Sequence, residues 1–242
     1  VEIRTKNNDL IILDMGTGLS KLGETILTDS TYPKNIHIFL SHYHWDHLLG
    51  FLNFTPLFDK SFSITIYGNN KSTSIDKISE KLLDKAFWPV SLDMLKAKIN
   101  FIELENEPIV INNTIINFKD HTHPNGATSY KVTIDDFSIV YSTDSEHENN
   151  NLNENVLEIA KNTDILIHDS HFTEEDLDNH IGWGHSSWKQ AVNVAIKSNA
   201  KKLFLFHYSP EYNDDVIDTI EMKAQQFLQT CEASKQNLKI NF

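Results

Sequence analysis

Two patterns of apolar residues alternate along the chain. Short continuous apolar runs indicate buried strands, and longer segments with an apolar residue at every third or fourth position indicate amphipathic helices. The runs predict strands at 10–13, 36–40, 62–67, 99–104, 109–111, 114–119, 128–134, 137–142, 165–167 and 203–206, and near Leu238. The second pattern predicts helices at 72–85, 91–97, 152–161, 173–179, 187–198 and 215–233, and a short one after Gly18.

Strands and helices recur in both halves of the chain, and each half begins with strands and ends with helices. This order fits an α/β fold in which two sheets pack face to face with helices outside, an αββα four-layer sandwich. A chain of 242 residues can bury one large core, so we expect a single domain over 1–242. Residues 51–98 are expected to form an insertion on the substrate side, and 145–155, rich in Asn and Glu, an exposed connection.

Side chains that bind metal ions follow several of the expected strands. Loops at strand ends are held rigidly, and binding sites of α/β proteins often lie there. Four strands end in such side chains: His42 after 36–40, the loop 121–123 after 114–119, Asp144 after 137–142 and His207 after 203–206. We therefore expect a metal site at one edge of the sheet sandwich.

The densest group of these side chains lies in residues 41–47. Four of them stand within six positions: His42, His44, Asp46 and His47. Three imidazoles and a carboxylate so close together are costly unless a divalent cation compensates them. The alternative, a solvated histidine-rich loop, is disfavoured because the rest of the chain supplies further ligands.

The composition bears on partners and location. The formal net charge is −13 at pH 7, from 21 Lys and Arg against 34 Asp and Glu. Such a chain is not expected to bind nucleic acid nonspecifically, so we expect a small substrate held by metal ions. No apolar run approaches the ~20 residues that span a membrane, and a lone cysteine, Cys231, allows no internal disulfide. We expect a cytoplasmic protein without a membrane partner. Because the chain begins at Val1 and not at Met, the absence of a visible leader segment is only weak evidence for this expectation.

The motifs together resemble those of the metallo-β-lactamase-fold hydrolases over nearly the whole chain. The resemblance rests on residues 13–18, on His42-x-His44-x-Asp46-His47, and then in order on His123, Thr143-Asp144 and His207. The stretch Gly182-Trp183-Gly184-His185-Ser186 is similar to the phosphodiesterase branch, which includes ribonuclease Z and small cyclic-nucleotide phosphodiesterase-like proteins. Many small members have a further strand before the segment at which this chain starts, so the first sheet is expected to lack an edge strand.

The resemblance implies two divalent metal ions, Zn²⁺ first, with Mn²⁺ or Fe²⁺ as alternatives. The implied ligands are His42, His44 and His123 for one ion, Asp46, His47 and His207 for the other, and Asp144 as the bridge. His121 competes with His123 for the third position. The family places this ligand six or seven residues before a small residue followed by Tyr, and Ser129-Tyr130 favours His123.

The resemblance also implies residues that support the ligands. Asp14 is expected to accept the ring N–H of a metal-binding histidine. His168 and Asp169, at another strand end, are expected to act in the same supporting way because the metal positions are already filled. For Asp14, a role in the turn before Gly16 is compatible with this one.

Two residues are the catalytic candidates. Asp46 would act at the metal site. His185 lies just before the helix at 187–198, and the resemblance implies that it contacts the scissile phosphate and protonates the leaving oxygen, with a surface histidine next to Trp183 as the alternative. Trp88 and Trp183 are candidates for stacking on a nucleobase, with ordinary packing as the alternative.

These assignments predict a dinuclear phosphodiesterase that acts on a small phosphodiester or a cyclic nucleotide through a metal-bridging hydroxide. Asp144 favours this over β-lactam hydrolysis, because the β-lactam-hydrolysing members lack the bridging Asp. The alternatives are a thioester or lactone hydrolase of the glyoxalase II type and a tRNA 3′-processing endonuclease. The charge of −13 disfavours tRNA, as does the lack of a visible arm like that of ribonuclease Z. A homodimer is a further expectation, because it is common for such folds.

Overall fold

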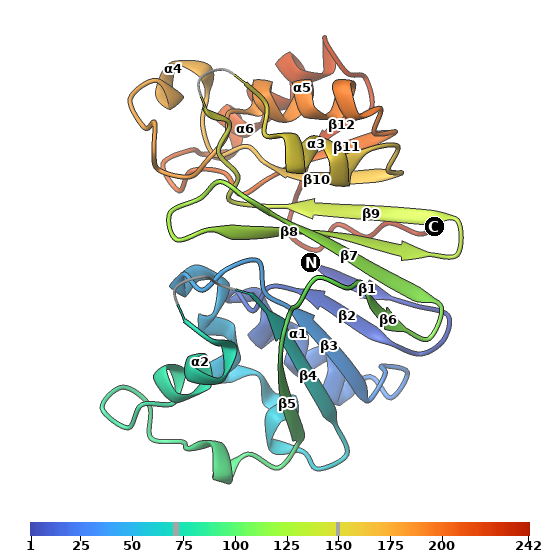
Figure 1. The fold of residues 1–242 in the computed structure, drawn as a ribbon, viewed down its shortest axis with the longest axis vertical. Helices are drawn as coiled ribbons and strands as arrows, with labels where there is room; N and C mark the ends of the chain where they lie inside the picture. Colours follow the sequence, from blue (N-terminus) through green and yellow to red (C-terminus); the bar gives the residue numbers. More distant parts are fainter. Residues whose placement is uncertain (70–72, 149–150) are drawn as a thin grey trace. The chain divides into compact units, whose positions relative to one another are not determined.

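The computed structural model describes residues 1–69, 73–148 and 151–242 and divides the chain into two compact units (Figure 1). Unit 1 spans Val1–Glu107 and unit 2 spans Pro108–Phe242. Each unit consists of one β-sheet and the helices that pack on it. In the part of the chain that the structure describes, no helix is both long enough and apolar enough to cross a membrane.

Unit 1 is built on a five-stranded sheet in the order β1-β2-β3-β4-β5 (Figure 1). Its strands are β1 (Glu2–Arg4), β2 (Leu10–Leu13), β3 (Asn35–Phe39), β4 (Ser63–Gly68) and β5 (Lys98–Glu103). Strands β2 to β5 run parallel, and β1 pairs antiparallel with β2. All four residues of β2 are buried, which explains why this parallel strand has a continuous apolar run and not an alternating pattern.

Two helices, α1 (Gly18–Thr28) and α2 (Ile75–Leu82), bury apolar side chains in the core of unit 1. Short 3-10 helices cover Trp45–His47, Leu49–Asn53, Thr55–Phe58 and Leu92–Met94. The helix expected at 72–85 is shorter than predicted, and its residue 72 lies outside the described residues. Strand β4 lies between β3 and β5, so this part of 51–98 belongs to the sheet, while a role of the segment on the substrate side stays a prediction.

Unit 2 is built on a seven-stranded sheet in the order β12-β11-β10-β9-β8-β7-β6. Its strands are β6 (Ile109–Ile111), β7 (Thr114–His121), β8 (Ala127–Ile134), β9 (Phe137–Ser142), β10 (Ile165–Asp169), β11 (Lys202–Phe206) and β12 (Cys231–Ala233). Strands β9 to β12 run parallel, and the pairs β6–β7, β7–β8 and β8–β9 are antiparallel. Because one antiparallel strand separates β7 from β9, these two strands point in the same direction.

Helices α3 (Glu154–Ala160), α5 (Trp188–Ser198) and α6 (Asp214–Gln225) contribute to the apolar core of unit 2, and α4 (Glu174–Leu177) is a single turn. Two sequence predictions are wrong here, and a third is only partly right. The helix expected at 215–233 ends at Gln225, and Cys231 pairs on β12 with Leu203 of β11. Leu238 lies outside any strand. The exposed connection expected at 145–155 is only partly right: residues 145–147 are buried, residues 148, 151, 154 and 155 are exposed, and 149–150 lie outside the described residues.

In each unit, the strand ends that carry polar side chains lie at one edge of the sheet. In unit 1, Leu13 of β2 pairs in parallel with Phe39 of β3, so Asp14 and residues 41–47 leave the sheet side by side. In unit 2, the parallel strands β9, β10 and β11 are neighbours, and their carboxyl ends meet at one edge. The end of β7 lies at that same edge because β7 shares their direction.

Three of the residues within two positions of these strand ends have a left-handed backbone. The φ angles are 66° at Asp14, 51° at Asp144 and 61° at His207. This conformation costs a non-glycine residue ~1–3 kcal/mol, and such residues cluster at functional sites. The functional site is therefore expected at these strand ends.

Candidate metal centre

Asp14 holds the histidine-rich stretch of unit 1 in place. Its Oδ1 accepts the backbone N–H of Ser41 at 2.6 Å, and its Oδ2 accepts the Ser41 hydroxyl and the Nδ1–H of His47, each at 2.8 Å. Burial alone would raise the pKa of Asp14, but the interactions with His47, together with the Ser41 N–H, outweigh it and hold that pKa below its ordinary value. The buried carboxylate is therefore ionised at neutral pH and fixes the start of the stretch.

These hydrogen bonds select the tautomers of two histidines. Because His47 donates its Nδ1–H to Asp14, the lone pair of its ring lies on Nε2. The Ser41 hydroxyl donates to Asp14 and accepts from Nδ1 of His42 at 3.0 Å, which leaves the lone pair of His42 on Nε2 as well. A neutral imidazole with its lone pair on Nε2 is a form that binds metal ions.

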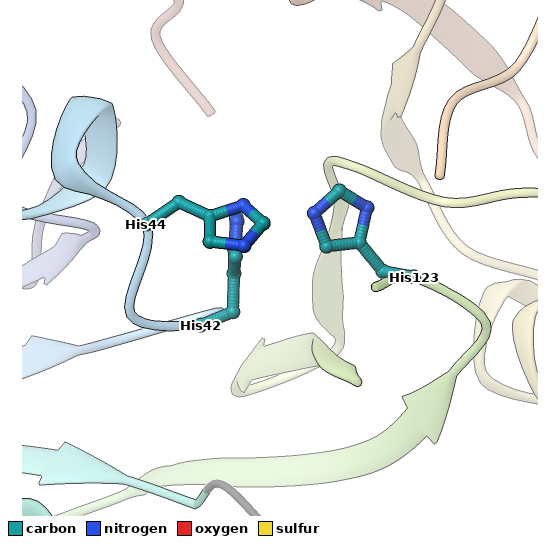
Figure 2. Close-up of side chains that lie close together, drawn as sticks. All are labelled: His42, His44 and His123. Carbon is teal, nitrogen blue, oxygen red and sulfur yellow. The ribbon is translucent and has the colours of Figure 1, made fainter. Parts of the chain in front are cut away.

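The metal-binding atoms of this stretch lie close together. The ring centroids of His42 and His44 are 4.5 Å apart in an edge-to-face arrangement, and those of His42 and His47 are 4.3 Å apart. Oδ2 of Asp46 lies 3.1 Å from Nε2 of His47, although 62% of the Asp46 side chain is exposed. Figure 2 shows His42 and His44 on the loop after β3, and it also draws His123, which belongs to the loop after β7.

In unit 2, Gly184 orients His123. The Nδ1–H of His123 donates to the Gly184 carbonyl at 2.8 Å, so the lone pair of this ring also lies on Nε2. A Cβ on Gly184 would lie 2.1 Å from Nδ1 of His123, and the φ angle of Gly184 is +88°. Only glycine allows so close an approach with this backbone conformation. The Gly184 position of the sequence motif thus has a direct structural reason.

Asp144 directs one oxygen toward each of two histidines. Its Oδ2 lies 3.8 Å from Nε2 of His123, and its Oδ1 lies 3.4 Å from Nε2 of His207. Both distances exceed those of ordinary hydrogen bonds. Two ligand atoms that each bind a tetrahedral zinc ion at about 2.1 Å are separated by about 3.4 Å. The spacing therefore fits a cation bound between this carboxylate and an imidazole.

Asp169, at the end of β10, connects Asp144 with His185. This carboxylate is fully buried, and its Oδ2 accepts the backbone N–H of Asp144 at 3.0 Å and the Nδ1–H of His185 at 2.9 Å. Asp144, Asp169, His185 and His207 each offer one ligand atom, and these four atoms lie within 4.8 Å of one another. His185 thus lies directly beside two of the predicted metal ligands. It also precedes α5, whose N-cap is Ser187.

Two further histidines brace these side chains. His171 stacks on His185 with ring centroids 4.2 Å apart, and its Nδ1 bonds to the His207 carbonyl at 2.9 Å. His121 is buried, and its Nε2 lies 3.1 Å from the Asp144 carbonyl. Burial lowers the pKa of His121 to about 4 despite that backbone bond, so its ring is neutral at pH 7. The structure thus places His121 behind the Asp144 backbone.

Glu146 also belongs to this site and was not predicted from the sequence. Its carboxylate is buried and accepts the backbone N–H groups of Gly182 and Gly184. The only signal in the sequence was its position two residues after Asp144, in a segment whose polar composition indicated an exposed connection.

The remaining predicted residues lie as follows. His168 bonds through Nδ1 to the Asp169 carbonyl at 2.7 Å, and its ring stacks on His147 with centroids 5.3 Å apart. Trp88 is partly buried and packs against the core of unit 1. Trp183 is 61% exposed, two positions before His185. The supporting role of His168 and the substrate contacts of both tryptophans stay predictions.

The donor atoms within each unit are of the kinds that bind divalent metal ions. Hydrogen bonds fix three of the predicted ligands, His42, His47 and His123, with the lone pair on Nε2, and Asp144 adds a carboxylate that is 2% exposed. Imidazole and carboxylate ligands suit Zn²⁺ and also Mn²⁺ or Fe²⁺.

Proteins named ribonuclease Z are similar in sequence to this chain. The protein from Picrophilus torridus is 40% identical over 106 residues, and that from Archaeoglobus fulgidus is 39% identical over 105 residues. Each alignment covers 43% of this chain but only 31% and 33% of the relatives, so it spans about a third of their length. The protein from Thermoplasma acidophilum is 25% identical, and that alignment covers 96% of this chain and 87% of the relative.

These relatives contradict the prediction of a small-molecule substrate in a chain that does not bind nucleic acid nonspecifically. A ribonuclease acts on RNA, and the similarity to ribonuclease Z extends over nearly the whole chain. The prediction relied on the net charge of −13. That sum was the wrong quantity, because the field at a metal site depends on the local charges and on the bound cations.

Solved structures have the same fold. The metallo-β-lactamase fold protein YhfI from Bacillus subtilis matches with a TM-score of 0.73 at 20% identity, covering 96% of this chain and 86% of that one. Human tRNase Z, short form, matches with a TM-score of 0.65 at 16% identity, covering 86% and 85%. The predicted α/β metallo-β-lactamase fold is thereby confirmed. The family model described as "Beta-lactamase superfamily domain" matches residues 11–208. The chain therefore belongs to the β-lactamase superfamily.

Proposed function

We propose that the chain is a metal-dependent phosphodiesterase that cleaves RNA. The observation that carries the proposal is the position of His185, whose ring lies beside Asp144 and His207 and is fixed there by Asp169. His185 is not among the proposed metal ligands, and hydrolysis of a thioester or lactone does not require such an additional imidazole beside them. The ribonuclease Z relatives support RNA as the substrate.

The proposed site holds two divalent metal ions, with zinc as the first choice. The proposed ligands are His42, His44 and His123 for one ion, Asp46, His47 and His207 for the other, and Asp144 for both. When bound, the two ions would make hydroxide available at neutral pH and neutralise charge on the phosphate. Asp46 remains the second catalytic candidate because its exposed carboxylate lies 3.1 Å from Nε2 of His47.

His185 is proposed to move a proton to the leaving oxygen. Its Nδ1–H is committed to Asp169, so Nε2 is the atom that faces the substrate and exchanges protons. The carboxylate of Asp169 keeps the ring in this orientation, as a buried partner carboxylate does for a catalytic histidine. The stacked ring of His171 limits rotation of His185 from the other side.

The test is cleavage of a precursor tRNA with a 3′ trailer, and of bis(p-nitrophenyl) phosphate, by protein loaded with Zn²⁺ or Mn²⁺. We expect both to be cleaved, and we expect His185→Ala to lower the rate by about 10²–10⁴-fold with unchanged metal content, as for loss of a general acid. His37→Ala is the matched control, because this partly buried histidine contacts Tyr67 in the middle of the unit 1 sheet. Protein that holds two metal ions but cleaves neither substrate, or that cleaves only a thioester, would refute the proposal.

A further inference from the structure

Glu146 is a buried carboxylate whose two oxygens bond to one turn of the chain. Glu146 is only 7% exposed. Oε1 accepts the backbone N–H of Gly182 at 2.6 Å, and Oε2 accepts that of Gly184 at 2.8 Å. Burying a carboxylate is unfavourable unless its oxygens accept hydrogen bonds, and here each oxygen accepts one. The two partners lie 36 and 38 residues away from Glu146 in sequence. A carboxylate buried in this way, with partners so distant along the chain, indicates a specific role.

The turn that Glu146 binds is the one that orients His123. Gly182 and Gly184 have φ angles of +86° and +88°, which glycine adopts readily but which do not by themselves define one conformation. The Gly184 N–H donates to Glu146, while the Gly184 carbonyl accepts the Nδ1–H of His123 at 2.8 Å. The same peptide segment therefore joins the carboxylate of Glu146 to the ring of His123.

Glu146 also binds the loop of His123 directly. Its backbone N–H donates to the carbonyl of Thr122 at 2.9 Å, next to His123. The neighbouring Ser145 carbonyl accepts the hydroxyl of Ser186, one position after His185. Residues 145 and 146 thus connect the loops that carry His123 and His185, and they follow Asp144 directly in sequence.

We propose that Glu146 is a positioning residue for the metal centre: it fixes the turn 182–184 so that the Gly184 carbonyl holds His123 with Nε2 toward the metal ion. This inference rests on the proposed function for the assignment of His123 as a ligand. A neighbour that bonds to the second nitrogen of a metal-binding histidine fixes the orientation and tautomer of its ring, and loss of such a neighbour typically costs 10–100-fold in metal affinity. Glu146 acts one step further out, on the group that makes that bond.

The experiment compares Glu146→Gln with Glu148→Gln by competition for Zn²⁺ against a chromophoric chelator. Gln has the size of Glu, but its amide NH₂ group would face one of the two glycine N–H donors, so one hydrogen bond is replaced by a donor–donor contact. We expect the zinc Kd of Glu146→Gln to rise by about tenfold or more. Glu148 is exposed and two positions away, so Glu148→Gln should bind zinc as wild type does.

The measurement includes a readout that a general loss of stability does not change. In metal-free wild type, the Nδ1–H of His123 should give a slowly exchanging, downfield imidazole resonance. This resonance should be lost in Glu146→Gln while the far-UV circular dichroism stays that of wild type. A folded Glu146→Gln protein that keeps the resonance, or whose zinc Kd stays within about twofold of wild type, overturns the proposal.

A second measurement covers the case in which Glu146→Gln does not fold. Deuterium exchange of wild type then decides, because the amides of Gly182 and Gly184 should exchange slowly if Glu146 binds both. Exchange as fast as in an exposed loop overturns the proposal. Neither measurement uses catalysis, so a wild-type chain that binds zinc but cleaves no RNA would refute the proposed function and leave the result on Glu146 unaffected.

Discussion

Gly184 offers a test of the site at the scale of one residue. Its replacement by alanine would place a Cβ 2.1 Å from Nδ1 of His123 and 2.3 Å from Cδ of Pro124. The ring of His123 must then move away from the Gly184 carbonyl and lose the hydrogen bond that sets its tautomer. We expect Gly184→Ala to lower zinc affinity by about 10–100-fold, measured by chelator competition.

Gly182→Ala is the matched control for that prediction. Gly182 has nearly the same φ angle, +86°, and the same hydrogen-bond acceptor, but a Cβ there meets nothing within 4 Å. It should therefore pay only the backbone cost, about 1–2 kcal/mol of unfolding free energy, and keep its zinc affinity. Equal losses of zinc affinity in the two variants would show that backbone strain, and not displacement of His123, is responsible.

Single residues also show what local pattern can and cannot predict. The metal-binding types at strand ends, among them His42, Asp144 and His207, are visible because each follows an apolar run. The role of Glu146 is invisible in the sequence, because its partners are backbone N–H groups that only the folded chain brings near. The choice between His121 and His123 has a similar origin: both are buried, and they differ in what their ring nitrogens bond to.

At the scale of elements, β10 has acidic residues at its two ends with different surroundings. At the carboxyl end, Asp169 accepts N–H groups from Asp144, Ser186 and His185. At the start, Asp164 accepts the Ser138 N–H and pairs with the exposed ammonium of Lys201. The same substitution at both ends therefore separates a role in the site from a role in the sheet.

We expect Asp169→Asn to lower kcat for RNA cleavage by about 10²-fold or more, because an amide NH₂ would face N–H donors and the ring of His185 would lose its anchor. The dependence of the rate on pH should change as well, because His185 supplies the proton to the leaving oxygen. Asp164→Asn should lose some thermal stability and keep the wild-type pH profile. An unchanged profile in Asp169→Asn, with normal folding and metal content, would argue against a role of His185 in proton transfer.

Sequence patterns predicted the strands of this chain better than its helices. All four residues of β2 and the three central residues of β11 are buried apolar side chains, and such a pattern is local. The short strands β1 and β12 lack an apolar run and were not predicted. The helix expected at 215–233 failed because its apolar spacing continues past Gln225, whereas the chain turns there and pairs β12 in parallel with β11. Pairing with a distant strand overrides a helical pattern and cannot be read from the segment itself.

At the scale of the whole molecule, the chain and the proposed RNA substrate are both negatively charged. The chain has 34 acidic and 21 basic residues, yet its relatives are ribonucleases. If the RNA is held mainly at the metal centre and by base contacts, few lysine or arginine side chains contact its phosphates. The exposed ring of Trp183, two positions before His185, is a candidate for one such base contact.

Binding through the metal centre and base contacts predicts that the affinity for RNA depends only weakly on salt concentration. Affinity for single-stranded nucleic acid falls with salt at a logarithmic slope of about −0.7 per neutralised phosphate. With about two such contacts, affinity should fall only about sevenfold between 50 and 200 mM salt, whereas proteins with six to ten contacts lose about 10³–10⁵-fold over that range.

The measurement is the Kd of the zinc-loaded His185→Ala protein for a fluorescent precursor tRNA across a chloride series, with metal content checked at each point. A slope steeper than about −4 would mean that about six or more phosphates are neutralised. The RNA would then be held by a basic surface in spite of the net charge, and not by the metal centre.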